Sequence, residues 1–194
     1  MRKITFIIAF FALVFSCSQK ETIQKNDWFH DCLKGEVKTI EESYFGASGT
    51  AEKTEKGALS TKVIISYDKN GYRIENRDKI KVHFNAAGLK DTIINIDGNG
   101  VMESKFINGF NENNELIMTQ MFDKNGNPVY TWKYEYDTNN CLIMETLYNA
   151  VGTQMSSNRF VYENDSKGNW IKKVIISEDS NEPLQVIERS ITYY

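Results

Sequence analysis

Histidine is scarce in this sequence, which limits the chemistry that the chain can offer. His30 and His83 are the only two among 194 residues, and neither has a second histidine or a Cys-x-x-Cys pair at metal-binding spacing. There is no nucleophile elbow and no phosphate-cradling glycine motif. Residues 95–100 (NIDGNG) imitate half of a calcium loop, but Phe106 stands where the loop needs glutamate. We therefore expect no enzymatic activity, no catalytic residues, no metal site and no cofactor.

Excess positive charge and long hydrophobic runs are also missing. The chain has 23 Lys and Arg against 26 Asp and Glu, a net charge of −3, without a basic cluster. This balance argues against a nucleic-acid partner and against a polybasic membrane patch. The apolar run from Ile4 to Phe15 is shorter than the roughly 20 residues that a spanning helix needs.

That run follows Arg2 and Lys3, a pattern typical of a secretory signal. Residues 14–17 (VFSC) resemble a bacterial lipobox, whose cysteine is acylated and becomes the first mature residue. The resemblance implies a signal peptide over 1–16 and covalent lipid on Cys17, and two or three acyl chains would anchor the protein stably to a membrane. An ordinary cleaved signal with an incidental cysteine is the alternative.

The residues after Cys17 predict a tether. Residues 17–32 are mainly polar, with room for a short helix near 27–33, and 18–21 (SQKE) resemble the charged tag of some surface lipoproteins. We expect an outer-membrane lipoprotein that is either exposed on the cell surface or faces the periplasm.

Two cysteines, Cys32 and Cys141, remain for the mature chain. Export to an oxidising compartment would permit a disulfide between them. The sequence alone does not show that they come within bridging range, so it favours two unpaired, half-buried thiols over the bridge.

Turn motifs recur along the rest of the chain. The motif is an aromatic or aliphatic residue, Asp or Asn, two further residues, then Gly or Asn, and it occurs at 67–71, 84–88, 96–100, 110–114, 122–126, 136–140 and 148–152. From 84–88 onward its spacing alternates between 12 and 14 residues, which gives a repeat of 26. Asp or Asn can accept hydrogen bonds from the backbone N–H two residues on, and Gly or Asn tolerates positive φ.

Between the turns, side chains alternate as in half-buried strands. The pattern predicts an all-β fold: an open, solenoid-like antiparallel meander of about ten to twelve strands. We expect one domain over 33–194, in which neighbours in sequence are neighbours in the sheet. Its small and charged residues predict a loop insertion at about 46–61.

The motifs YDKNG (67–71), FDKNG (122–126) and YEYDTNN (134–140) resemble the YD repeats of Rhs-type proteins. With LKGEVKTI (33–40) and GNWIKK (168–173), the layout is similar to that of small bacterial lipoproteins that carry such repeats. Large Rhs proteins form closed shells around a toxin, but this chain is too short for a shell, so that function is not carried over.

An aromatic stripe in residues 130–136 is the candidate binding face: Tyr130, Trp132, Tyr134 and Tyr136. Tyr and Trp give rigid contact area for a sugar or protein. The alternative is that these rings are cross-strand packing in a sheet without a second layer.

These observations predict a non-enzymatic, lipid-anchored envelope or cell-surface binding protein for a glycan or a protein. The alternative is a structural, accessory or immunity-type lipoprotein with one dedicated protein partner. An envelope hydrolase is the function that the residues favour least.

Overall fold

The computed structural model describes residues 26–74 and 79–194. These residues form one short helix and eleven strands: α1 (Asp27–His30), β1 (Val37–Gly49), β2 (Thr54–Ser66), β3 (Ile80–Phe84), β4 (Lys90–Ile96), β5 (Met102–Phe110), β6 (Leu116–Asp123), β7 (Pro128–Tyr136), β8 (Leu142–Asn149), β9 (Gln154–Asn164), β10 (Trp170–Ser177) and β11 (Pro183–Tyr193). The predicted signal peptide, Cys17 and most of the tether lie outside the described residues, so the predictions about them stay predictions.

All eleven strands belong to one antiparallel sheet, ordered β2-β1-β11-β10-β9-β8-β7-β6-β5-β4-β3. The predicted all-β, open antiparallel fold is confirmed, and from β3 to β11 each strand pairs with its neighbours in sequence. The exception is the opening hairpin, because β2 does not pair with β3, and β1 lies between β2 and β11. The register of β1 with β11 runs from Val37 opposite Tyr193 to Gly46 opposite Gln185. The hairpin of β1 and β2 therefore adds two strands to the sheet beside β11.

The loop expected at about 46–61 is instead a hairpin. The strands β1 and β2 each have 13 residues, and Gly49 lies opposite Thr54, so only a short turn separates them. Small residues here serve close backbone approach: a Cβ on Gly57 would lie 3.1 Å from the Gly46 carbonyl oxygen. Because β2 is an exposed strand at the edge of the sheet, it needs no apolar alternation, which is the signal that sequence analysis relied on.

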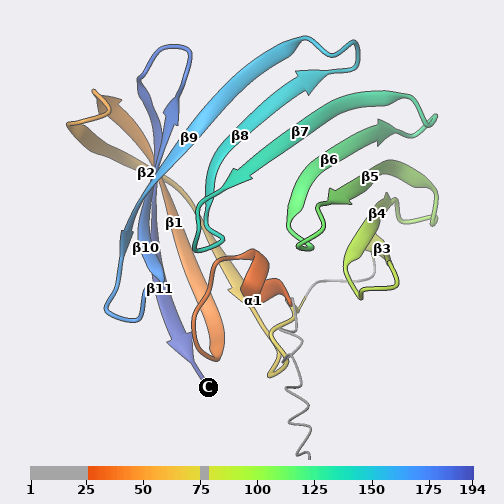
Figure 1. Cartoon of the computed structure of the whole chain (residues 1–194), viewed down its shortest axis with the longest axis horizontal. Coiled ribbons are helices and arrows are strands. Elements are labelled where there is room, and N and C mark those ends of the chain that lie inside the picture. The colour runs from red at the N-terminus through yellow and green to blue at the C-terminus, as the bar shows by residue number, and fades with distance from the viewer. Residues whose placement is uncertain (1–25, 75–78) are drawn as a thin grey trace, which may run out of the picture.

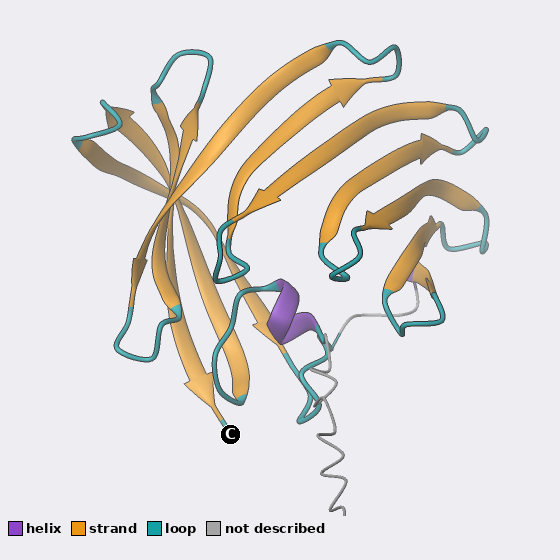
Figure 2. Cartoon of the chain, viewed as in Figure 1, coloured by secondary structure: helices purple, strands orange, loops and turns teal. Residues whose placement is uncertain are grey.

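Each of the predicted turns has the predicted chemistry. In the turn of residues 123–127, the Asp123 carboxylate accepts the N–H of Asn125 at 2.9 Å and of Asn127 at 2.8 Å. The same pair of bonds recurs in seven other turns, at Asp68, Asn85, Asp97, Asn111, Asp137, Asn149 and Asp165. The residue three positions on always has positive φ: Gly71, Gly88, Gly100, Asn114, Gly126, Asn140, Gly152 or Gly168. These turns lie along the rims of the sheet (Figure 2).

The sheet curves into an open arch, and α1 lies on its inner side (Figure 1). We call the face toward α1 the inner face. The main buried cluster forms below α1, from Leu33, Val37, Ile40 and Tyr67, with Trp28 packed against it. A smaller cluster joins β10 and β11 to β1: Val174, Ile176 and Val186 with Phe45. The core therefore sits where the opening hairpin meets the last strands.

Two glycines of one turn provide a matched test of the turn chemistry. Gly100 has φ of 79°, whereas Gly98 does not have positive φ, and an added Cβ would meet nothing within 4 Å at either position. We expect Gly100→Ala to lower the free energy of unfolding by about 1 kcal/mol, because an L residue is strained in the left-handed region.

Gly98→Ala should cause no loss of stability. The measurement is the urea midpoint of both variants and the wild type. Equal midpoints for the two variants would show that the positive φ at this turn carries no energetic cost.

Candidate functional site

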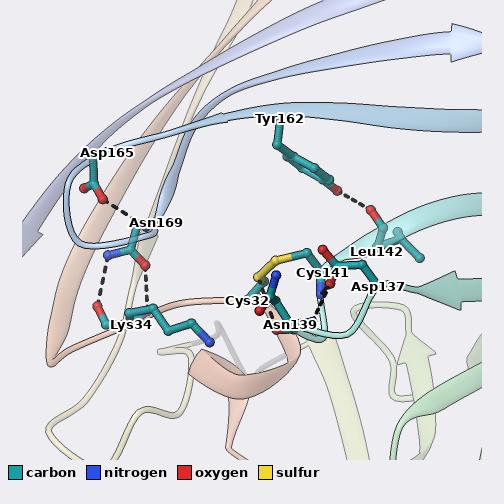
Figure 3. Close-up of a disulfide and its surroundings, with 9 residues drawn as sticks. All are labelled: Cys32, Lys34, Asp137, Asn139, Cys141, Leu142, Tyr162, Asp165 and Asn169. Atoms are coloured by element: carbon teal, nitrogen blue, oxygen red, sulfur yellow. Dashed lines mark hydrogen bonds between the residues drawn. A yellow bond between two sulfur atoms is a disulfide. The ribbon is translucent and has the colours of Figure 1, made fainter.

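A disulfide joins the segment that follows α1 to the turn between β7 and β8. Cys32 and Cys141 are bonded, with their Cα atoms 5.2 Å apart and a separation of 109 positions in sequence (Figure 3). Of the two alternatives that the sequence left open, the structure shows the bridge. We call residues 26–34, which contain α1 and the residues after it, the helix segment. The disulfide fixes the end of this segment to the inner side of the arch.

The next residues are held by a buried amide. Asn169, which is fully buried, accepts the Lys34 N–H at 2.6 Å and donates to the Lys34 carbonyl oxygen at 3.0 Å (Figure 3). It also donates to the Tyr193 hydroxyl at 2.8 Å. The turn before β10 therefore anchors the chain as it leaves α1.

Two carboxylates of the helix segment bind neighbouring elements. Asp31 forms a two-point ion pair with Arg73, through Nε at 2.9 Å and Nη2 at 2.5 Å, and accepts the Tyr67 hydroxyl at 2.6 Å. Asp27 accepts the Arg73 N–H at 2.7 Å and lies 3.1 Å from Lys90 Nζ. These contacts fix the helix segment against both the β2 end and the β4 end of the sheet.

A cavity of about 350 Å³ lies between the helix segment and the inner face of the sheet. Its apolar and aromatic lining comes mainly from β3 to β8: Phe84, Leu89, Ile93, Phe110, Leu116, Tyr134, Tyr136 and Leu142. Its polar lining is Asn26, Asp27, Asp31, Tyr72, Arg73, Lys90 and Asn108, with Gly88. The volume is at the lower end of the range for small-ligand sites, and the mixture of a largely apolar wall with a few polar groups is typical of them.

The predicted aromatic stripe divides at this cavity. Tyr134 and Tyr136 line it, and Tyr130 and Trp132 do not. The Trp132 ring instead lies 5.9 Å from Tyr130 and 6.5 Å from Phe106, centroid to centroid. Half of the stripe thus faces the cavity, while the other half makes the ring contacts that the packing alternative expects.

Burial governs the ionisation of the cavity tyrosines. It raises the pKa of Tyr134 and of Tyr136 above the ordinary phenol value, and Glu145 adds to both shifts. Burial likewise raises the pKa of the Glu145 carboxyl, which lies opposite Tyr134 in the sheet. Both phenols therefore stay protonated at neutral pH and can donate hydrogen bonds from a largely dry wall.

A half-buried lysine lies further along the inner face. Lys173 of β10 is opposite Tyr162 of β9 in the sheet register, so both side chains are on one face. Burial first, and the charge of Arg189 second, lower the pKa of Lys173 to about 8, while Glu42, Glu145 and Asp31 act in the opposite direction. The amine is therefore mostly charged at neutral pH in a poorly hydrated environment.

Sequence analysis missed the four charged residues that fix the helix segment: Asp27, Asp31, Arg73 and Lys90. One signal was available, because Asp27 and Asp31 are four residues apart near a predicted helix and would share a face. Their partners, Arg73 and Lys90, are distant in sequence, and no sequence pattern pointed to them.

Two kinds of feature are not found in the described part of the chain. No group of three or more His, Cys, Asp and Glu in residues 26–74 and 79–194 could hold a metal ion. No helix there is long and apolar enough to cross a membrane.

The pKa of Lys173 predicts a pH dependence of stability. Its folded pKa, about 8, lies below the unfolded value of 10.5, so the unfolded chain holds more protons between these values and stability should rise with pH there. In Lys173→Met this rise should be lost. Lys172→Met, whose native side chain pairs with Glu163 at 2.6 Å on the exposed side, is the control.

The measurement is the free energy of unfolding from about pH 7.5 to 10, in urea. As the pH approaches 10, where tyrosines of the unfolded chain ionise, the buried tyrosines with raised pKa reduce stability in every variant alike, so the difference between the variants carries the result. A slope in Lys173→Met equal to the wild-type slope would contradict the assignment.

The disulfide predicts a large loss of stability on removal. We expect Cys32→Ser with Cys141→Ser to lower the free energy of unfolding by about 4 kcal/mol, because the bridge closes a loop of more than 100 residues in the unfolded chain. The measurement is the urea midpoint with and without reductant. Reductant should lower the midpoint of the wild type and leave that of the double variant unchanged, and a wild type that is indifferent to reductant would contradict the bridge.

Comparison with known proteins gives distant likeness only. No family model matches the chain, and no curated protein matches its sequence. Among solved structures, a porin-like protein of Bacteroides uniformis has 9% identity and a TM-score of 0.43, over 80% of this chain and 98% of that one. A porin-like protein of Bacteroides vulgatus has 10% identity and a TM-score of 0.32, over 83% and 99%.

The complex TcdB2–TccC3 has 17% identity and a TM-score of 0.31 over 66% of this chain, which spans 9% of that one. Structural neighbours therefore include the TcdB2–TccC3 complex and porin-like Bacteroides proteins. At such scores none carries an argument about function, and the predicted resemblance to YD-repeat lipoproteins stays a prediction.

Proposed function

We propose that this chain is a non-enzymatic binding protein of the bacterial envelope or cell surface, and that its binding site is the cavity between the helix segment and the inner face. The observation that supports a site here is that the helix segment, which forms one wall of the cavity, is held firmly in place. A disulfide, two ion pairs and a buried amide hold one wall in place. A preformed site of this kind avoids the cost of ordering on binding.

The lining favours a ligand that presents an apolar or aromatic group. Eight of the lining residues are apolar or aromatic, and they come from several strands. Its polar groups already have partners within the protein: Asp27 and Asp31 are ion-paired, and Asn108 bonds the Lys90 carbonyl oxygen and Thr119. Few groups remain to bind the hydroxyls of a neutral sugar.

Of the two ligand classes, glycan and protein, the cavity therefore favours a protein segment that inserts an apolar side chain. Tyr134 and Tyr136 supply rigid rings and protonated hydroxyls for such a contact. Lipid on Cys17 would keep the site at the membrane surface, at the end of the tether.

The experiment is a fluorescence titration with N-phenylnaphthylamine, an uncharged apolar probe that brightens in a dry site. We expect saturable binding to the wild type. Leu116→Trp fills the cavity and should weaken probe binding about tenfold, a loss of about 1.4 kcal/mol. Ile117→Trp, at the adjacent position whose side chain is 40% exposed, should leave the affinity unchanged.

Displacement then separates the ligand classes. A pool of peptides with apolar residues should displace the probe, while neutral oligosaccharides should not. Displacement by the oligosaccharides alone would support the glycan class instead. Saturable binding that is the same in Leu116→Trp and Ile117→Trp would show that the cavity is not the site.

A further inference from the structure

A second cluster on the inner face lies beyond the cavity, around Trp170 at the start of β10. The Arg189 guanidinium stacks on the Trp170 ring, with its Cζ 3.3 Å from the ring centroid. Lys173 Nζ lies 4.9 Å from the same centroid and 5.4 Å from that of Phe160. Two cations thus share one aromatic ring, an arrangement that adds cation–π attraction but also places like charges side by side.

Arg189 has one guanidinium nitrogen without a partner. Its Nε and Nη2 both donate to a single oxygen of Glu42, at 2.8 Å and 2.7 Å. The other oxygen of Glu42 accepts the Tyr44 hydroxyl. The third nitrogen, Nη1, bonds no described residue. It is also shielded from water, because only 6% of the side chain is exposed. A charged donor in this state lacks an acceptor that a guanidinium normally finds.

Lys173 is in a similar state. No carboxylate oxygen of the described residues lies within 4.0 Å of its Nζ, in contrast with neighbouring Lys172. Glu145 and Glu42 act on it only at longer range. Of the two cations, Arg189 alone has a carboxylate in close contact, that of Glu42.

Tyr162 connects the cluster to the wall of the cavity, although neither it nor the two cations line the cavity itself. The Tyr162 ring lies 5.7 Å from Trp170, and its hydroxyl donates to the Leu142 carbonyl oxygen at 2.6 Å. Leu142 lines the cavity, and Figure 3 shows Tyr162 reaching toward it from β9. A ligand whose apolar group fills the cavity would extend past Tyr162 toward the two cations.

From this juxtaposition we infer that Lys173, with Arg189 behind it, forms a subsite for an anionic oxygen group of the ligand. The inference rests on the proposed function and deepens it: the ligand is an acidic protein segment, in which a carboxylate follows an apolar side chain. Lys173, which is partly exposed, makes the first contact. Arg189, buried behind it, adds to the positive field that attracts the carboxylate.

The test uses two probes that differ by one charged group. Anilinonaphthalene sulfonate carries an anionic sulfonate on the ring system of N-phenylnaphthylamine, which has none. We expect Lys173→Met to raise the dissociation constant of the sulfonate about tenfold, the value of one charge-assisted hydrogen bond, and that of the neutral probe less than about twofold.

Three controls accompany the titration. Lys172→Met, whose side chain pairs with Glu163, should leave both affinities unchanged. Lys173→Arg keeps the charge and should retain most of the wild-type affinity for the sulfonate. Circular dichroism and the urea midpoint show that each variant is folded.

An acidic peptide should displace the sulfonate from the wild type more strongly than the same peptide with its carboxylates amidated. Equal losses for both probes in Lys173→Met, or no loss for either, would overturn the subsite while leaving the cavity as a binding site. If the wild type binds neither probe, the proposed function fails and the subsite fails with it. Displacement by a free aryl carboxylic acid but not by the acidic peptide would overturn the protein segment and indicate a small acid.

Discussion

A single-layer sheet has to bury one face against something, and the inner face of this sheet relies on its own curvature and on α1. No second sheet lies among the described elements, which all belong to one eleven-strand sheet. The four-residue helix is too short to be stable by itself, since isolated helices need about 12 residues or more. Its position therefore depends on covalent and ionic contacts, and those same contacts shape the cavity.

The curvature has a local origin. Seven turns of the same construction join consecutive strands from β3 to β10, and register shifts occur where most strand pairs leave their turns. Such irregularities increase twist and bend a sheet. A repeated turn thus sets the shape of the arch, whereas the contents of the inner face differ from strand to strand: apolar residues near β3 to β8, and paired charges near β9 to β11 and β1.

Features that depend on neighbouring residues could be predicted from the sequence. The turn motif was enough to predict seven of the eight Asx turns and the antiparallel order of the strands that they join, because residues such as Asp123 and Gly126 act within five residues. Features that depend on distant residues could not. The pairing of β1 with β11 joins positions about 150 residues apart. The sequence left a bridge between Cys32 and Cys141 as one of two alternatives, and the folded structure shows it. The candidate site shows the same division, since alternation put Tyr134 and Tyr136 on one face but gave no sign of Arg73 or Lys90 beside them.

The pairing of β1 with β11 also sets an order of events in biosynthesis. The hairpin of β1 and β2 can form as soon as it is made, but one edge of β1 stays open until the other nine strands have been made. An unpaired strand edge is a template for association with other chains. During that interval β2, whose sequence is exposed, polar and contains lysines, covers only one edge of β1. The other edge of β1 therefore has to be protected by delayed formation of the hairpin, by a chaperone or by rapid completion of the chain.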